Sequence, residues 1–154
     1  MRARLLSANV LVWFSAALIL LACGPLRGQA ADMKVEAQLL WGTDDDKSPN
    51  PKHKPVEPEI RKKLKQLPLR WKNYFEECRV LIKLPPGAAK KTSLSAYCDL
   101  EVKNLDGTRV EVTHYGAGKR VATRTQSLPK GEMLVLGGNA PDSTAWLVVL
   151  RRLE

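Results

Sequence analysis

Closely spaced turn signals in the second half of the chain constrain its fold more than any other feature. Beyond Tyr74, stretches in which apolar and polar residues alternate are separated by short turns rich in glycine, proline or asparagine. Alternation with a period of two is typical of half-buried β-strands, and these residue types form hairpin turns. The pattern favours a mainly β fold, an antiparallel β sandwich or a partly closed barrel, over an α/β fold. We expect about seven strands, at residues 33–41, 74–84, 92–103, 108–115, 119–127, 132–137 and 144–152. The last of these is apolar on both faces and is predicted to be internal.

Residues 42–58 interrupt this pattern. Four prolines in the segment exclude a central strand or a helix, so we interpret it as a linker inside the domain. Its last residue, Pro58, suits the first turn of a short helix. Ile60, Leu64 and Leu67 would form the apolar stripe of that helix, and Pro68 would end it.

The first 30 residues have the organisation of a signal peptide. Arg2 and Arg4 form a positive head, and a mostly apolar run from Leu5 to Ala22 follows. A retained membrane anchor is the alternative. The run contains several polar residues and barely reaches the ~18–20 apolar residues that span a bilayer. We therefore expect a bacterial-type precursor that is exported to the periplasm or secreted.

Two cleavage patterns compete in this segment. Gly28-Gln29-Ala30 offers small residues at the positions that a signal peptidase inspects, and cleavage there leaves a chain that begins at Ala31. Leu20-Leu21-Ala22-Cys23 is similar to a bacterial lipobox, in which Cys23 would be acylated and would anchor the protein in the envelope. We favour cleavage after Ala30 and keep lipidation of Cys23 as the alternative.

Size and charge bound what remains after cleavage. Residues 31–154 are enough for one domain with its own core. Removal of residues 1–30 takes away three arginines and no acidic residue, so the formal charge falls from +9 to +6. A positive charge suits anionic partners such as lipid headgroups or acidic polymers. An exported protein meets little nucleic acid, so we expect no specific nucleic-acid binding.

Two cysteines remain in the expected mature chain. Cys78 and Cys98 each lie on the apolar face of an alternating stretch, on either side of a loop at 85–91. If 74–84 and 92–103 pair as a hairpin, the two cysteines lie opposite each other, within reach of a disulfide. Two buried free thiols are the alternative. We predict a structural disulfide without a redox role.

The densest group of charges is basic and follows the proline-rich linker. Aromatic side chains lie close to it in the sequence, as they do at surfaces that bind anionic lipid or polysaccharide. The other interpretation is the solvated back of an amphipathic helix. The segment is still the best candidate for anion binding or peripheral membrane contact, and its residues are Arg61, Lys62, Lys63, Lys65, Arg70 and Lys72.

No convincing catalytic or metal-binding pattern is present in the sequence. The chain has two histidines, and the two mature cysteines lack the close spacing of zinc ligands, so we expect no metal and no cofactor. His114 alternates with Val110 and Val112, which is typical of a core or rim histidine. A small carboxylate-dependent hydrolase is the alternative to a non-enzymatic protein. Its candidate residues would be Glu76, Glu77, Asp99 and Glu101, with Glu77 and Asp99 as neighbours in the expected hairpin.

Short stretches of the sequence are similar to known bacterial proteins. Residues 128–138 resemble a turn-and-strand element of bacterial secretins, which implies a β-hairpin alone. Residues 35–43, 70–75 and 134–150 together resemble a group of small exported bacterial proteins of unknown function. That resemblance implies no activity. We expect a non-enzymatic envelope or secreted domain that acts by surface contact with a protein or an anionic envelope polymer.

Overall fold

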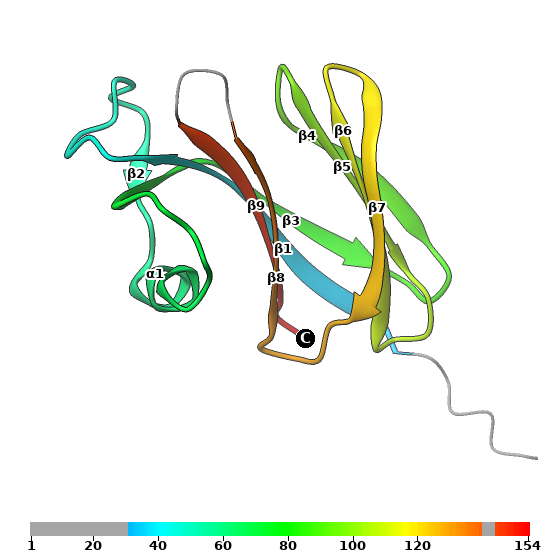
Figure 1. The fold of residues 1–154 in the computed structure, drawn as a ribbon. Helices are drawn as coiled ribbons and strands as arrows, with labels where there is room; N and C mark the ends of the chain where they lie inside the picture. Colours follow the sequence, from blue (N-terminus) through cyan, green and yellow to red (C-terminus); the bar gives the residue numbers. More distant parts are fainter. Residues whose placement is uncertain (1–30, 140–143) are drawn as a thin grey trace, which may run out of the picture.

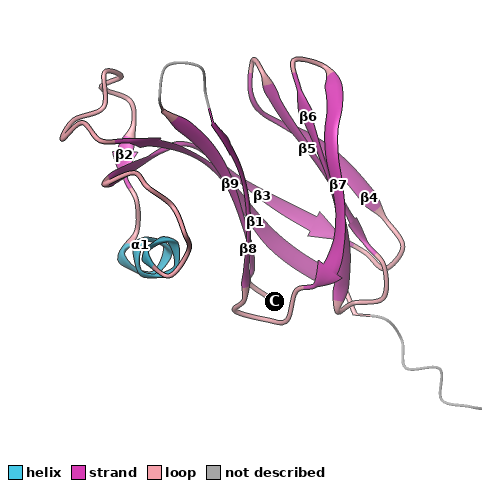
Figure 2. Ribbon diagram, viewed as in Figure 1, coloured by secondary structure: helices cyan, strands magenta, loops and turns pink. Residues whose placement is uncertain are grey.

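The computed structural model describes residues 31–139 and 144–154, which form two antiparallel β-sheets packed face to face with one short helix (Figures 1 and 2). The predicted mainly β, sandwich-like fold is therefore confirmed. The expected signal peptide, both of its cleavage sites and Cys23 lie outside the described residues.

Sheet A has five strands in the order β2-β3-β1-β9-β8. Its central strand β1 (Met33–Thr43) pairs with β3 (Asn73–Leu84) on one side and with β9 (Ala145–Arg152) on the other. The short β2 (Lys54–Pro55) extends the sheet beyond β3, and β8 (Met133–Asn139) forms the opposite edge. All but two residues of β1 are buried, since this strand is covered on both faces.

Sheet B has four strands in simple meander order, β4-β5-β6-β7. They are β4 (Ala89–Ser95), β5 (Cys98–Asn104), β6 (Arg109–Gly116) and β7 (Lys119–Ser127). Sheet B contributes only its inner face to the core, so β5 alternates strictly between buried and half-buried residues. Every residue of β7 is exposed.

Two hydrophobic clusters hold these layers together. The larger lies between the sheets and includes Val35, Ile82, Leu100, Val112 and Leu150. The smaller lies on the outer face of sheet A, beneath helix α1 (Pro58–Lys65). Figure 1 shows α1 on the side of sheet A away from sheet B, so the molecule has three layers at that position. Within the described ranges, no helix has the length and apolar character needed to cross a membrane.

The predicted hairpin between residues 74–84 and 92–103 is wrong. The first stretch is β3 of sheet A, whereas the second divides into β4 and β5 of sheet B around a turn at Ala96 and Tyr97. The chain therefore changes sheets after Leu84. The buried Asn104 fixes this crossing, because its side-chain amide donates a hydrogen bond to the Leu84 carbonyl at 3.0 Å and its backbone N–H donates to the Ala88 carbonyl at 2.9 Å.

The segment expected to be a linker, 42–58, is partly structured. Its first two residues finish β1, and Lys54 and Pro55 form the edge strand β2 against β3. In the loop between them, His53 lies against Trp41 with ring centroids 6.2 Å apart, and Ser48 hydrogen-bonds to the ring of His53. Proline is compatible with an edge strand because one side of such a strand needs no hydrogen-bond donor.

Candidate binding groove beside helix α1 and strand β8

Helix α1 places basic side chains in solvent because its apolar stripe is fixed on sheet A. Pro58 occupies its first turn, and Ile60 and Leu64 are completely buried against the outer face of the sheet. The helix carries Glu59 in its first turn and Lys62, Lys63 and Lys65 near its end. This distribution of charge suits the helix dipole.

A network of ion pairs fastens the beginning of α1 to the sheet. Glu36 on β1 is only 6% exposed, and its carboxylate lies 2.8 Å from Arg151 of β9 and 3.4 Å from Arg79 of β3. The same two arginines reach Glu57, the residue before the helix, at 2.6 Å from Arg79 and 3.3 Å from Arg151. Arg151 also contacts Glu59 at 3.3 Å. Charge-assisted hydrogen bonds of this kind fix both position and orientation.

The network has a consequence for the rest of the helix. The hydrogen bond that Glu57 accepts from Arg79 lowers the pKa of Glu57, which keeps that carboxylate charged and paired. The acidic residues at the beginning of α1 are thus already paired with arginines. Within residues 31–139 and 144–154, none of the six predicted anion-binding side chains forms an ion pair with another residue.

Two hollows lie one after the other between α1, the loop that follows it and the edge strand β8. The smaller, of about 210 Å³, is lined by Lys62 and Lys63 and also by the carboxylates of Glu59 and Glu132, with Met133 at its floor. The larger, of about 520 Å³, is lined mostly by apolar groups and by Arg70. We call them together the α1–β8 groove, defined by Glu59, Lys62, Lys63, Leu67, Arg70, Trp71, Glu132, Met133, Val135, Gly137 and Leu147.

Two successive glycines of β8 let neighbouring side chains lie flat on both faces of the strand, and Gly137 does so at the floor of the groove. Gly137 pairs with Leu147, whose side chain lies across it, and a Cβ at Gly137 would come within 2.5 Å of Leu147 Cδ2. Gly138 accommodates the indole ring of Trp146 in a similar way, but on the inner face of the sheet, away from the groove. At the wall, the guanidinium carbon of Arg70 lies 5.1 Å from the centroid of the Trp71 ring. The groove therefore combines an apolar floor with a rim on which three cations, Lys62, Lys63 and Arg70, outnumber the carboxylates of Glu59 and Glu132.

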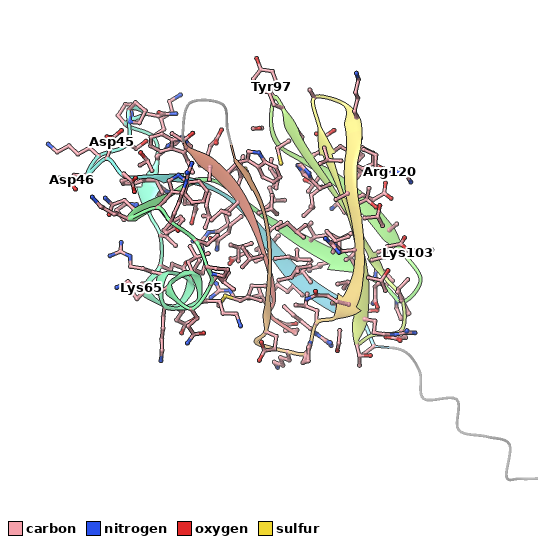
Figure 3. All side chains as sticks on the ribbon, viewed as in Figure 1. Asp45, Asp46, Lys65, Tyr97, Lys103 and Arg120 are labelled. Carbon is pink, nitrogen blue, oxygen red and sulfur yellow. The ribbon has the colours of Figure 1, made fainter. Side chains whose placement is uncertain are left out.

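The predicted basic residues do not all share this groove. Arg61, Lys62 and Lys65 surround a separate shallow hollow of about 290 Å³ with Val56 and Pro58. Lys72 is exposed beyond the loop, where its backbone N–H donates to Asp44 at 3.1 Å. Lys62, Lys63 and Arg70 are thus the three that face β8. Figure 3 shows Lys65 on one side of the molecule and Lys103 and Arg120 on the other, so positive charge is present at both ends.

The two cysteines are free thiols that belong to opposite sheets. Cys98 on β5 is buried in the cluster between the sheets, and Cys78 on β3 packs against the same cluster. Their partners in the strand register are Leu39 for Cys78 and Ser95 and Gly116 for Cys98, so the cross-strand pairing expected from the sequence is wrong.

Neither thiol has the environment of an activated nucleophile. Burial, Asp99, Glu77 and Cys78 raise the pKa of Cys98 to about 11. Cys78 borders a polar hollow of about 570 Å³ beside β2, but burial and the neighbouring carboxylates of Glu77 and Glu76 raise its pKa as well. Both cysteines therefore stay protonated near neutral pH, and a protonated thiol is a poor nucleophile.

The carboxylates of the alternative hydrolase hypothesis do not form the expected pair. Glu76 is on sheet A and forms an ion pair with Arg79, whereas Asp99 is on sheet B and lies 3.2 Å from Lys91. Glu77 and Asp99 are not cross-strand neighbours, because their strands belong to different sheets. Glu101 pairs in register with Lys91 and Thr113 within sheet B. The structure provides no carboxylate pair in contrasting environments from these four residues.

His114 and the loop that carries Asp44 and Asp45 have structural roles. The His114 ring is buried and stacks on Trp146 at 4.5 Å, and its burial lowers its pKa, so the imidazole is neutral. Asp45 accepts a hydrogen bond from the Thr43 hydroxyl, and Asp44 accepts one from the backbone N–H of Lys72 in the segment before β3. In the part of the chain that the structure describes, no three His, Cys, Asp or Glu residues lie together as a metal site.

Sequence reasoning missed the two features that build the groove. The alternation in β1 placed Glu36 and Gln38 on a polar face, but their burial depends on α1, which covers that face from a distant part of the sequence. The exposed edge of β8 depends on the strand order of sheet A, which no local pattern encodes. The absence of charged residues from 133–139 was the one available signal that this strand could form an apolar binding surface.

No family model matches this sequence, and no curated protein or solved structure matches it either.

Proposed function

We propose that this protein is a non-enzymatic, exported domain that holds an anionic partner, a protein or an acidic envelope polymer, in its α1–β8 groove. One observation carries the proposal. Lys62, Lys63 and Arg70 border a largely apolar groove and outnumber its two carboxylates, Glu59 and Glu132, and none of these three cations forms an ion pair within the described residues. Unpaired cations beside apolar surface attract a partner electrostatically and then bury its apolar groups.

The cationic rim differs from the charges on the rest of sheet A. There, Arg79 and Arg151 form ion pairs with four glutamates, and these pairs fix the helix to the sheet. The glutamates are Glu36, Glu57, Glu59 and Glu76. The backbone that carries Lys62 and Lys63 is therefore fastened to the sheet.

Export to the periplasm or the secreted space is part of the proposal. The N-terminal pattern supports it, with cleavage after Ala30 or acylation at Cys23 as the two routes. The mass of the protein isolated from its native envelope distinguishes them. A chain beginning at Ala31 supports the soluble route, and a lipid-modified chain beginning at Cys23 supports the anchored one.

In an oxidising compartment we expect Cys78 and Cys98 to form a disulfide across the core. Cys98 belongs to the cluster between the sheets and Cys78 packs against the same cluster, and both are free thiols in the structure. Such a bond would join the two sheets and would stabilise the fold by about 3 kcal/mol. Mass spectrometry of exported protein after alkylation under denaturing conditions tests it. Two alkylated cysteines without prior reduction would contradict the prediction.

The function is tested by a titration with polyglutamate, followed through tryptophan fluorescence because Trp71 lines the groove. A triple variant, Lys62→Gln/Lys63→Gln/Arg70→Gln, is compared with Lys119→Gln/Arg120→Gln/Arg124→Gln on β7, which changes the net charge equally. We expect the groove variant to bind about tenfold more weakly than the β7 variant. High salt should weaken binding of the wild type. Equal losses in both variants would show that net charge alone acts, and the proposal would fall.

A further inference from the structure

Two sheets expose four edge strands, and three of these carry the usual protection against pairing with another chain. β2 has Lys54 and Pro55, and β4 has two lysines and a register shift near Ser93. β7 has three basic residues and a shift opposite His114. Charge, proline and bulges at an edge all discourage the addition of a further strand.

β8 has none of these devices. Its sequence from Met133 to Asn139 contains no charged residue and no proline, and it pairs in regular register with β9 alone. It is the last strand of sheet A, so one side of its backbone has no strand partner within the described residues. An uncharged edge of seven residues is a template for a further strand.

The hydrogen-bond register shows which residues of β8 face this open side. Arg152 donates to the carbonyl of Glu132 at 3.1 Å, so even-numbered residues of β8 bond to β9. The other side of β9 agrees, because Leu153 donates to Lys34 of β1 at 2.8 Å. Since the two sides alternate along an antiparallel strand, the N–H and C=O groups of Met133, Val135 and Gly137 point outward.

The groove lies beside this open edge. Met133 lines the smaller hollow, and Val135 and Gly137 line the larger one. An added strand would direct every second side chain toward α1, at intervals of about 7 Å. Those side chains would enter the two hollows in turn. This is the arrangement in which main-chain bonds provide affinity and pockets for alternate side chains provide specificity.

Charge decides among the strands that could be added. A second copy could pair antiparallel through β8. Lys62 and Lys63 of both copies would then lie on the same face of the joined sheet, where the like charges would repel each other. Residues 1–30 of this chain contain three arginines and no acidic residue, so their charge does not match the groove either. Within the described residues, the groove has three unpaired cations against two carboxylates, of which Glu59 is already paired with Arg151, so its net charge matches an acidic segment.

We propose that β8 accepts an extended acidic peptide segment of a partner protein as a sixth strand of sheet A, with alternate apolar side chains in the α1–β8 groove. This inference rests on the proposed function and names its partner class. The partner segment is an extended one in which apolar and acidic residues alternate. It needs no free end, because a strand can be added from the middle of a chain.

The test uses a capped octapeptide that alternates glutamate and valine, titrated into the whole protein by calorimetry. The first control is the same peptide with N-methyl groups on every second residue, which cannot complete the ladder, and the second alternates lysine and valine. We expect each control to bind about tenfold more weakly, since each removes several hydrogen bonds or reverses the charge. These comparisons use the wild-type protein and do not depend on a variant that folds.

Variants of the protein then locate the strand. Val135→Pro removes an outward N–H without touching the bonds to β9, and Val135→Thr is its control because it keeps that N–H. We expect about tenfold weaker binding for Val135→Pro than for Val135→Thr. Unequal binding would support strand addition at β8.

The possible failures separate the two proposals. Strand addition is wrong if the N-methylated peptide binds as tightly as the unmethylated one and Val135→Pro binds as tightly as Val135→Thr. If polyglutamate still binds the groove variant more weakly in that case, the anion-binding groove stands. If neither polyglutamate nor the glutamate–valine peptide binds, the proposed function falls with it. Dimerisation of the protein through β8 in place of peptide binding would overturn the choice of partner.

Discussion

The two edge strands β7 and β8 follow one another in the sequence, and they have opposite surfaces. Each pairs with one neighbour and leaves its other side open, one in sheet B and one in sheet A. All nine residues of β7 are exposed, and three of them are basic. β8 is uncharged and half-buried, with helix α1 on its outer side and Trp146 on its inner side.

The difference between these strands shows where the fold discourages contact and where it allows it. On β7, Thr123 hydrogen-bonds to Thr113 at 3.1 Å, while long charged side chains extend into solvent and keep other strands away. On β8, glycines replace large side chains, and neighbouring aliphatic and aromatic groups lie flat across them. A surface that is apolar, flat and bordered by cations is suited to binding, whereas β7 is suited to staying in solvent.

The ion pairs that support the groove give the largest expected effect. Glu36→Ala leaves Arg79 and Arg151 with fewer partners in a largely buried place, and we expect the free energy of unfolding to fall by about 3–5 kcal/mol. Glu154→Ala breaks an exposed pair with Lys34 and provides the comparison. Urea denaturation measures both. A loss below about 1 kcal/mol for Glu36→Ala would show that the network does not fasten α1 to the sheet.

The flatness of β8 gives the next effect. A Cβ at Gly138 would lie 2.7 Å from Cε2 of Trp146, a rigid ring that also stacks on His114. We expect Gly138→Ala to lower the free energy of unfolding by about 1–3 kcal/mol. Ala122→Val on the exposed β7 should change it by less than about 0.5 kcal/mol. If the two substitutions had equal effects, the contrast between the edges would not extend to their packing.

The smallest effect concerns the stacking of His114 on Trp146, which links the strand beside β7 to the strand beside β8. Burial lowers the pKa of His114, so the folded protein resists its protonation while the unfolded chain accepts a proton near pH 6.5. The stability contributed by neutral His114 is therefore complete above that pH and declines as the pH falls below it. Thermal unfolding between pH 7 and 5 should show a shallower loss of stability in His114→Phe, which keeps an aromatic ring against Trp146. Parallel curves would contradict this account.

The strands were predictable from the sequence wherever their determinants are local. Alternation and turn residues located β1, β3, β6, β7, β8 and β9 to within a few residues, and Pro58 with the stripe of Ile60 and Leu64 located the helix. The failure at 92–103 has a physical reason. Leu94 and Cys98 are both buried, so a continuous alternating strand and a tight hairpin give the same local pattern.

The candidate site was predictable only in part, for a related reason. The sequence identified the basic segment, because clustered charge is a local property. The groove beside it requires β8 to be an edge and α1 to lie on the adjoining face, and both depend on pairings between residues far apart in the chain. For the same reason, the sequence placed Cys78 opposite Cys98 in one hairpin when they belong to opposite sheets.

Hydrogen exchange at the two edges tests the central claim most directly. Backbone amide exchange is measured in the wild-type protein with and without the glutamate–valine octapeptide, and residues 119–127 of β7 are compared with residues 133–139 of β8. We predict that exchange slows at Met133, Val135 and Gly137, whose N–H groups face the open edge, and stays unchanged along β7. Slowing along β7 with none along β8 would contradict the account, because the protected edge would then be the one that binds.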